Sequence, residues 1–267
     1  MELTRDSVTA PFVLKTSDLP TQGGVVRKAD LWFVVHARLD EIEPETAASG
    51  GTGDQVVEAG NMRFELHRLT GSDLTQIGGP TPHRQAGSSV GYVHVKGRLL
   101  DRLEVEATDR IVGTRSGTEW VVASVTDENF DRDARYPNRW RPVQRKGTTD
   151  DPGPYALYPG GASIVTIQQL VTVPGALLVE AHFAFFEPQA WFNGGPILRS
   201  KLGLVTQDRV RALRREIAKS RKPSGGRSSQ ATRPERIPGR RDSEGHRVGL
   251  LSEGMLPARV TTRQVSE

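Results

Sequence analysis

The sequence predicts an α+β fold in which a mostly antiparallel, curved sheet or partial barrel packs against one C-terminal helix and is followed by a disordered tail. Apolar and polar residues alternate with a period of two through most of the first 200 residues, as they do in half-buried strands. A stripe of apolar residues with helical spacing follows, and after it neither period continues. We therefore expect one β-rich domain over residues 1–221 and a basic tail, rich in arginine, proline, glycine and serine, over residues 222–267.

Six to nine strands are expected, and each is predicted from its own alternation. The pattern predicts strands at residues 33–39, 62–66, 92–96 and 103–107, and a shorter apolar run predicts a more buried strand at residues 120–125.

The clearest strand pair covers residues 163–173 and 177–186, joined at Pro174-Gly175. Proline presets φ for the second position of a type II turn and glycine supplies the positive φ of the third, so this segment predicts a hairpin. On its second strand one face is apolar, and Glu180 and His182 lie together on the other face.

Three segments between the strands are expected to be loops: residues 47–54, 71–89 and 126–159. The last is long, charged and contains proline. Because loops of more than about 12–15 residues in a compact domain are usually functional or disordered, it is a place to look for a site.

One helix is predicted at about residues 201–220. Its apolar stripe contains Thr206, Val210, Leu213 and Ile217 at helical spacing. The basic residues Arg211, Arg214, Arg215 and Lys219 are expected on the opposite half, where they could contact a polyanion. Lys222-Pro223 should end the helix.

Strands followed by one long C-terminal helix resemble the topology of helix-grip domains, which bind lipids and other ligands. No sequence motif accompanies this resemblance. It implies a ligand-binding function by analogy of topology alone, and a fold by itself does not fix a function.

Composition excludes several kinds of site. The chain has no cysteine, which excludes disulfides, thiolate nucleophiles and cysteine-ligated metals. The first residues, MELTRDSVTAPF, lack the basic and apolar regions of a signal peptide, and the most apolar stretch, Ala176–Phe186, is too short and polar to span a bilayer. We therefore expect a cytoplasmic protein.

The net charge of +4 conceals an asymmetry. Residues 201–267 contain 16 Lys and Arg against 7 Asp and Glu, so the first 200 residues have a net charge of −5. A polyanion would therefore contact the C-terminal quarter of the chain.

Metal and nucleotide sites are not favoured. The histidines within the strand patterns, His36, His67, His94 and His182, lack metal-ligand spacing, and we interpret them as structural or surface residues. The run Asp127-x-Asn129-x-Asp131-x-Asp133 has alternating oxygen ligands but not the glycine and glutamate of a calcium-binding helix–loop–helix. The glycines of residues 50–53 lack the Gly-Lys-Ser/Thr ending of a phosphate loop, and no Gly-x-Ser-x-Gly elbow occurs. No metal and no cofactor is expected.

Two aromatic segments remain as possible ligand contacts. The segment RYPNRWRP (residues 135–142) either contacts a ligand or is anchored in the core by Trp140, and the composition favours the anchor. Trp191 and Phe192 precede a Gly-Gly-Pro sequence that either hinges a lid or connects a strand to the helix.

Three functions follow from these features. The first is a non-catalytic module that binds an apolar small molecule or lipid between sheet and helix, with Trp191, Phe192, His182 and Trp140 as contacts. The second is an interaction protein that contacts nucleic acid or an acidic partner through the basic helix and tail. The third, least supported, is an enzyme with Glu180 and His182 as an acid/base pair. The sequence favours the first and does not define the oligomeric state.

Overall fold

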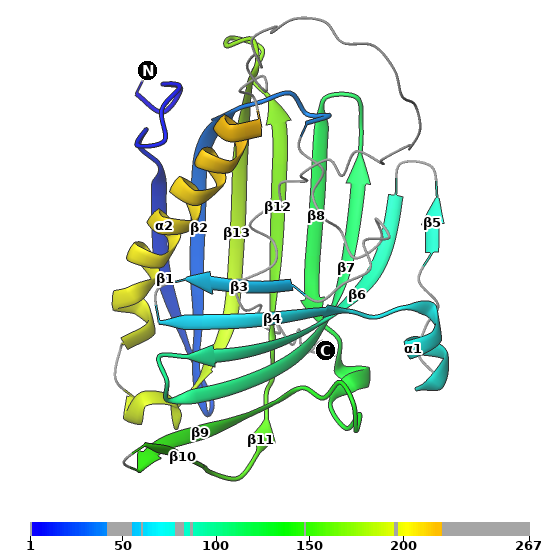
Figure 1. Cartoon of the computed structure of the whole chain (residues 1–267), viewed down its shortest axis with the longest axis vertical. Coiled ribbons are helices and arrows are strands. Elements are labelled where there is room, and N and C mark those ends of the chain that lie inside the picture. The colour runs from blue at the N-terminus through cyan, green and yellow to red at the C-terminus, as the bar shows by residue number, and fades with distance from the viewer. Residues whose placement is uncertain are drawn as a thin grey trace, which may run out of the picture.

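A computed structural model of the chain describes residues 2–41, 55–59, 61–77, 83–85, 88–146, 148–194 and 197–220. Within these ranges the chain forms thirteen strands, two α-helices and two short 3-10 helices (Figure 1). The predicted α+β fold, with one main helix late in the chain, is confirmed. The predicted loop at residues 47–54 and the predicted tail at residues 222–267 lie outside the described residues.

The strands belong to one antiparallel sheet. Their bounds are β1 (Val13–Thr21), β2 (Gly24–His36), β3 (Gln55–Ala59), β4 (Met62–Arg68), β5 (His83–Gln85), β6 (Ser88–Leu99), β7 (Leu103–Arg115), β8 (Glu119–Thr126), β9 (Arg139–Lys146), β10 (Thr149–Pro152), β11 (Ala156–Leu157), β12 (Gly161–Gln169) and β13 (Ala176–Pro188). The helices are α1 (Gly71–Gln76), η1 (Glu128–Phe130), η2 (Trp191–Gly194) and α2 (Ile197–Ser220).

The sheet is bent and is not closed into a barrel. Its main path runs β1-β2-β13-β12-β8-β7-β6-β4-β3, with β9 on β7 and β5 on β6. In Figure 1 the axes of five neighbouring strands are roughly aligned: β1, β2, β13, β12 and β8. Strands β3, β4 and β9 run across this direction. The long strands β6 and β7 bend from one part of the sheet into the other. The hydrogen bonds between these two strands therefore continue through both parts.

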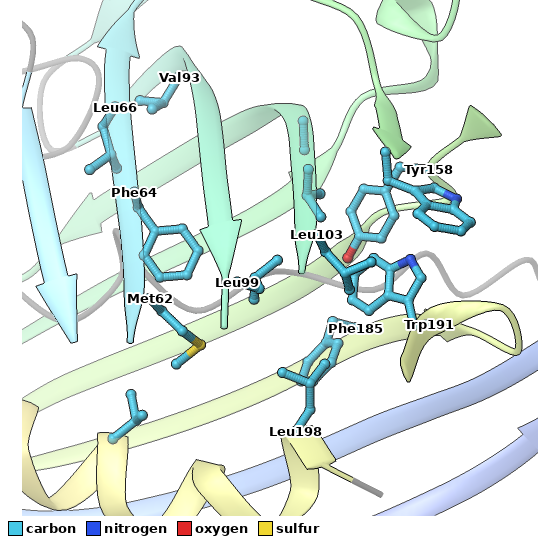
Figure 2. Close-up of a cluster of buried hydrophobic side chains, with 14 of the residues drawn as sticks. Met62, Phe64, Leu66, Val93, Leu99, Leu103, Tyr158, Phe185, Trp191 and Leu198 are labelled. Atoms are coloured by element: carbon cyan, nitrogen blue, oxygen red, sulfur yellow. The ribbon is translucent and has the colours of Figure 1, made fainter. Parts of the chain in front are cut away.

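The core lies on the side of the sheet that turns toward α2 and the crossing strands, which we call the inner face. One buried cluster lies between the two parts of the sheet and includes Phe64, Val105, Tyr158 and Trp191 (Figure 2). A second lies between α2 and strands β2, β12 and β13. The opposite side is called the outer face.

The predicted hairpin is confirmed, although its first strand ends at Gln169, four residues early. Gly175 has φ +74°, and the amide of Ala176 donates to the carbonyl of Val173 at 3.1 Å, as a type II turn requires. Burial alternates along β13 and the residues predicted to share its apolar face are all buried. The face assignment of this strand is therefore confirmed.

Helix α2 begins at Ile197, four residues before the predicted start, and its predicted apolar stripe is buried. It packs on β2 and also touches β3. These strands lie at opposite ends of the path through the sheet, so the helix spans the opening between the two ends.

Two predicted loops contain regular structure. Residues 71–89 include α1, which a Thr70–Asp73 capping box begins, and the short strand β5. Residues 126–159 include η1 and strands β9, β10 and β11. The alternation of β9 is short, because Arg139 and Arg141 flank buried Trp140 but Pro142 takes the next position on the inner face. The edge strand β1 was also missed, since most of its residues are exposed.

No helix among the described residues is both long and apolar enough to cross a membrane.

Candidate functional site

The predicted acid/base pair lies on the outer face of β13. His182 Nδ1 is 2.7 Å from Asp30 Oδ1, and His182 Nε2 is 3.0 Å from Glu180 Oε1. Trp32 Nε1 donates to the same Glu180 oxygen at 2.8 Å. The hydrogen bond to Asp30, followed by that to Glu180, raises the pKa of His182. With a carboxylate at each ring nitrogen, the charged imidazolium form is favoured. In that form the ring joins β2 to β13 and has no lone pair for proton abstraction.

We predict a small pH-dependent stabilisation from this contact. In wild type it should be complete below pH about 6.5, the ordinary histidine pKa, and be lost as the pH rises through the raised folded-state pKa. His182→Asn should remove this dependence. Because the side chain is 39% exposed, the effect should be about 0.5 kcal/mol. Urea denaturation of both proteins at pH 5.5 and 9 measures it, and an equal difference at both pH values would contradict the assignment.

The predicted aromatic ligand contacts lie inside the protein. Trp191 is fully buried and stacks on Tyr158 with ring centroids 5.7 Å apart and an interplanar angle of 13°. Trp140 is also buried and meets Trp191 edge to face at 5.8 Å. Phe192 packs edge-on against Trp191 and is partly buried. The structure therefore confirms Trp140 as a core anchor.

These aromatic residues do not share a pocket mouth with His182. The 3-10 turn η2 directs Trp191 into the inner cluster, whereas His182 lies on the outer face of β13. The four predicted ligand contacts therefore belong to two sides of the sheet.

The basic residues of α2 are not equivalent. Arg215 and Lys219 are exposed and Arg211 is partly exposed. Arg214 is 6% exposed, and its guanidinium donates to the backbone carbonyls of Val34, Ala10 and Pro11. The prediction that Arg214 lies with the other cations opposite the buried stripe is wrong, because Arg214 follows Val210 by four residues and so begins beside that stripe. From there its side chain reaches β2 and the segment before β1.

The acidic run after β8 organises its own loop. Asp127 Oδ1 accepts from the backbone amide of Asn129, and Asp133 Oδ1 accepts from the amide of Tyr136 at 2.7 Å. Asp131 Oδ1 accepts from the side-chain amide of Asn138. Among the described residues no three His, Cys, Asp or Glu side chains come together as metal ligands.

A group of polar residues that the sequence did not reveal lies on the inner face of three neighbouring strands. Asp109 on β7 and Thr126 on β8 are register partners, and Thr126 Oγ1 donates to Asp109 Oδ1 at 2.8 Å. Ser124 on β8 faces Ser163 on β12, with hydroxyl oxygens 2.8 Å apart. All four are buried. We call them the inner polar patch.

The carboxyl of Asp109 is the most unusual member of this patch. Desolvation raises its pKa from 3.8 to about 7, and only the hydrogen bond from Thr126 opposes the shift. Near neutral pH the carboxyl is therefore protonated in part of the molecules. In that form it can donate a hydrogen bond through its O–H and accept one through its other oxygen.

Two donors in the adjoining aromatic cluster have no hydrogen-bond partner within the described structure: Tyr158 Oη and Trp191 Nε1. Both side chains are fully buried, and the Tyr158 hydroxyl points into the cluster beside Leu103 and Trp191 (Figure 2). Burial and the nearby Asp109 carboxyl raise the pKa of Tyr158 well above its usual value, so its hydroxyl stays protonated. Thr206 Oγ1 on α2 is likewise buried and has no hydrogen-bond partner among the described residues.

The sequence contained one signal for the inner polar patch. Asp109 has the same parity as Leu103, Val105 and Ala107, so the alternation of β7 already placed a carboxylate on the apolar face. Such a residue breaks the pattern of a half-buried strand, and ionisable groups with strongly perturbed pKa values concentrate at functional sites.

Compared with protein families and with curated proteins, the sequence matches no family model and no curated protein.

Proposed function

We propose that the protein is a non-catalytic binding module for a small, mainly apolar molecule or lipid, held between the inner polar patch and α2. The observation that carries the proposal is the buried Asp109 carboxyl, with a pKa of about 7, on an otherwise apolar strand face. Binding sites for small molecules are mostly apolar and contain a few convergent polar groups, which fix the orientation of the ligand.

The unpartnered donors support the same site. Most buried polar side-chain atoms in proteins have a hydrogen-bond partner, and one without it costs about 1–3 kcal/mol. A ligand carbonyl, carboxyl or hydroxyl oxygen near Tyr158 or Trp191 would accept a hydrogen bond and remove that cost. Thr206 would act from the helix side.

A binding role fits the patch better than a catalytic one. The hydroxyls of Ser124 and Ser163 bond to each other, so neither is activated by a base. The buried histidine closest to Asp109 in the strand register is His94. It bonds to Thr108, which lies on the opposite face of β7 from Asp109, so it does not face the patch. One hydroxyl of the inner polar patch, that of Thr126, does bond to the Asp109 carboxyl, but its oxygen also accepts from the backbone amide of Gly161 at 3.0 Å, which holds it within the sheet.

The test is to fill the patch. Ser163→Leu places an apolar side chain over it, and Ile164→Leu changes the next residue on the outer face, where Ile164 is 42% exposed. Native mass spectrometry of protein purified gently from its source organism should show a co-purified small molecule in wild type and Ile164→Leu but not in Ser163→Leu. In the same three proteins, 1-anilinonaphthalene-8-sulfonate should bind saturably, except to Ser163→Leu.

The proposal fails if wild type contains no bound molecule and does not bind this dye saturably. It also fails if both variants retain the same ligand and the same dye affinity as wild type.

The other sequence-based expectations stay predictions. A cytoplasmic location is one. Weak contact with a polyanion is another, and after the placement of Arg214 it concerns Arg211, Arg215 and Lys219.

A further inference from the structure

A cavity lies on the outer face, on the other side of the sheet from the inner polar patch. Its volume is about 390 Å³. Strands β3, β4 and β6 and the segment before β9 form its walls, and its charged and aromatic lining residues are Glu65, His67, His94, Lys96, Arg135 and Tyr136. Because it is separate from the proposed ligand site, it calls for its own explanation.

The floor of this cavity is uncharged. His94 is 2% exposed, and its Nδ1 lies 2.8 Å from Thr108 Oγ1. The Thr108 hydroxyl donates to the carbonyl of Tyr136, so it accepts from His94, and the remaining lone pair of the ring is on Nε2. Desolvation, with a smaller effect of the Lys96 charge, lowers the pKa of His94 to about 3. The ring is neutral at physiological pH.

One wall is aromatic and fixed in position. Tyr136 and His67 stack with centroids 5.6 Å apart at an angle of 14°. The Tyr136 hydroxyl donates to Asp73 Oδ1 at 3.0 Å. Asp73 is itself held by Thr70 in the capping box of α1, and the hydrogen bonds from Thr70 lower the pKa of Asp73 to about 2. The wall is therefore built before any ligand arrives.

Lys96 differs from the two arginines near this cavity in its charge pairing. Arg135 lies 3.4 Å from Asp73, and Arg63 lies 3.0 Å from Glu65 and 3.9 Å from Glu58, so both arginines are engaged by carboxylates. Lys96 lies between Glu65 and Glu106 in the strand register. Within the described part of the chain, no carboxylate oxygen comes within 4 Å of its ammonium group. The Lys96 ammonium therefore has carboxylates on the neighbouring strands but no direct ion pair among the described residues.

We propose that this cavity binds a small organic carboxylate. The carboxylate would pair with Lys96, and its apolar body would lie against the Tyr136–His67 stack and Val56. A charge-assisted hydrogen bond to a lysine is strong where water is partly excluded. A cationic ligand would meet Lys96 with the wrong sign.

Benzoate and benzamide test the proposal, because they share a shape and differ in charge. Calorimetric titration of the full-length protein should give an affinity for benzoate at least about tenfold higher than for benzamide. Lys96→Gln should weaken benzoate binding about tenfold, and Lys96→Arg should preserve it. Lys28→Gln, at an exposed lysine on β2 remote from the cavity in the strand order, should change nothing.

Several results would overturn the proposal. They are equal affinities for benzoate and benzamide, no binding of either, or unchanged benzoate affinity in Lys96→Gln. Inorganic phosphate as an equal competitor of benzoate would contradict the role assigned to the aromatic wall. Because Ser163→Leu lies on the other face, it should leave benzoate binding intact, which separates this test from that of the inner polar patch.

Discussion

Asp109→Asn should remove a loss of stability that the wild-type protein undergoes between pH 4 and 8. The carboxyl has a pKa of about 7 in the folded protein and an ordinary value of 3.8. Below pH about 4 it is protonated in both states and costs nothing. As the pH rises toward 7 the unfolded chain ionises first, so folding is opposed by up to about 4 kcal/mol. Denaturant titrations of both proteins from pH 4 to 8 measure the difference.

The absolute stability of Asp109→Asn is not the test, because burying the asparagine amide also costs free energy of folding. The test is the change with pH in the difference between the two proteins. Asp208→Asn, which changes an exposed carboxylate on α2, should follow the wild-type profile throughout. A constant difference between wild type and Asp109→Asn across the range would show that Asp109 is not buried as a neutral acid.

Arg214→Met should destabilise the protein by about 3 kcal/mol or more. The guanidinium donates to the carbonyls of Val34 and Pro11, each at 3.1 Å, and also to that of Ala10. Methionine retains much of the apolar stem but leaves buried carbonyls without a donor, and a hydrogen bond to a charged group contributes about 1.5–3 kcal/mol. The loss should appear as a lower urea midpoint with an unchanged m-value.

Arg215→Met is the matched control, because the neighbouring arginine is exposed and should change stability by less than about 0.5 kcal/mol. Equal effects of the two substitutions would mean that Arg214 does not join α2 to β2.

The alternation of apolar and polar residues predicted those strands in which one face is buried and the other is exposed to solvent. The hairpin of β12 and β13 and the stripe of α2 were found because their apolar spacing is unbroken. Strands β9 to β11 were missed because arginines and acidic residues pair across their outer face, as Arg141 does with Glu104. Such charge pairing is long-range and leaves no periodic trace in the sequence.

The candidate site was less predictable than the fold. Trp191 was recognised as important, but its burial depends on Tyr158 and Trp140, which are far from it in sequence. Arg214 was assigned to the exposed half of its helix because it is charged, although its spacing, four residues after Val210 and three before Ile217, places it beside the buried stripe. Asp109 was visible as a break in alternation, but only neighbouring strands reveal how little water reaches it.

The order in which the strands are joined has a consequence for synthesis on the ribosome. Strand β2 pairs with β1 on one side and with β13 on the other. Phe33 of β2 therefore cannot pair with its register partner Val179 until β13 has been translated. While the intervening residues are translated, one edge of this hydrophobic strand remains open, which is a hazard for intermolecular pairing. Partners so distant along the chain also slow the search for the native state. A nascent chain of this protein should therefore depend on chaperones until its last strand has emerged.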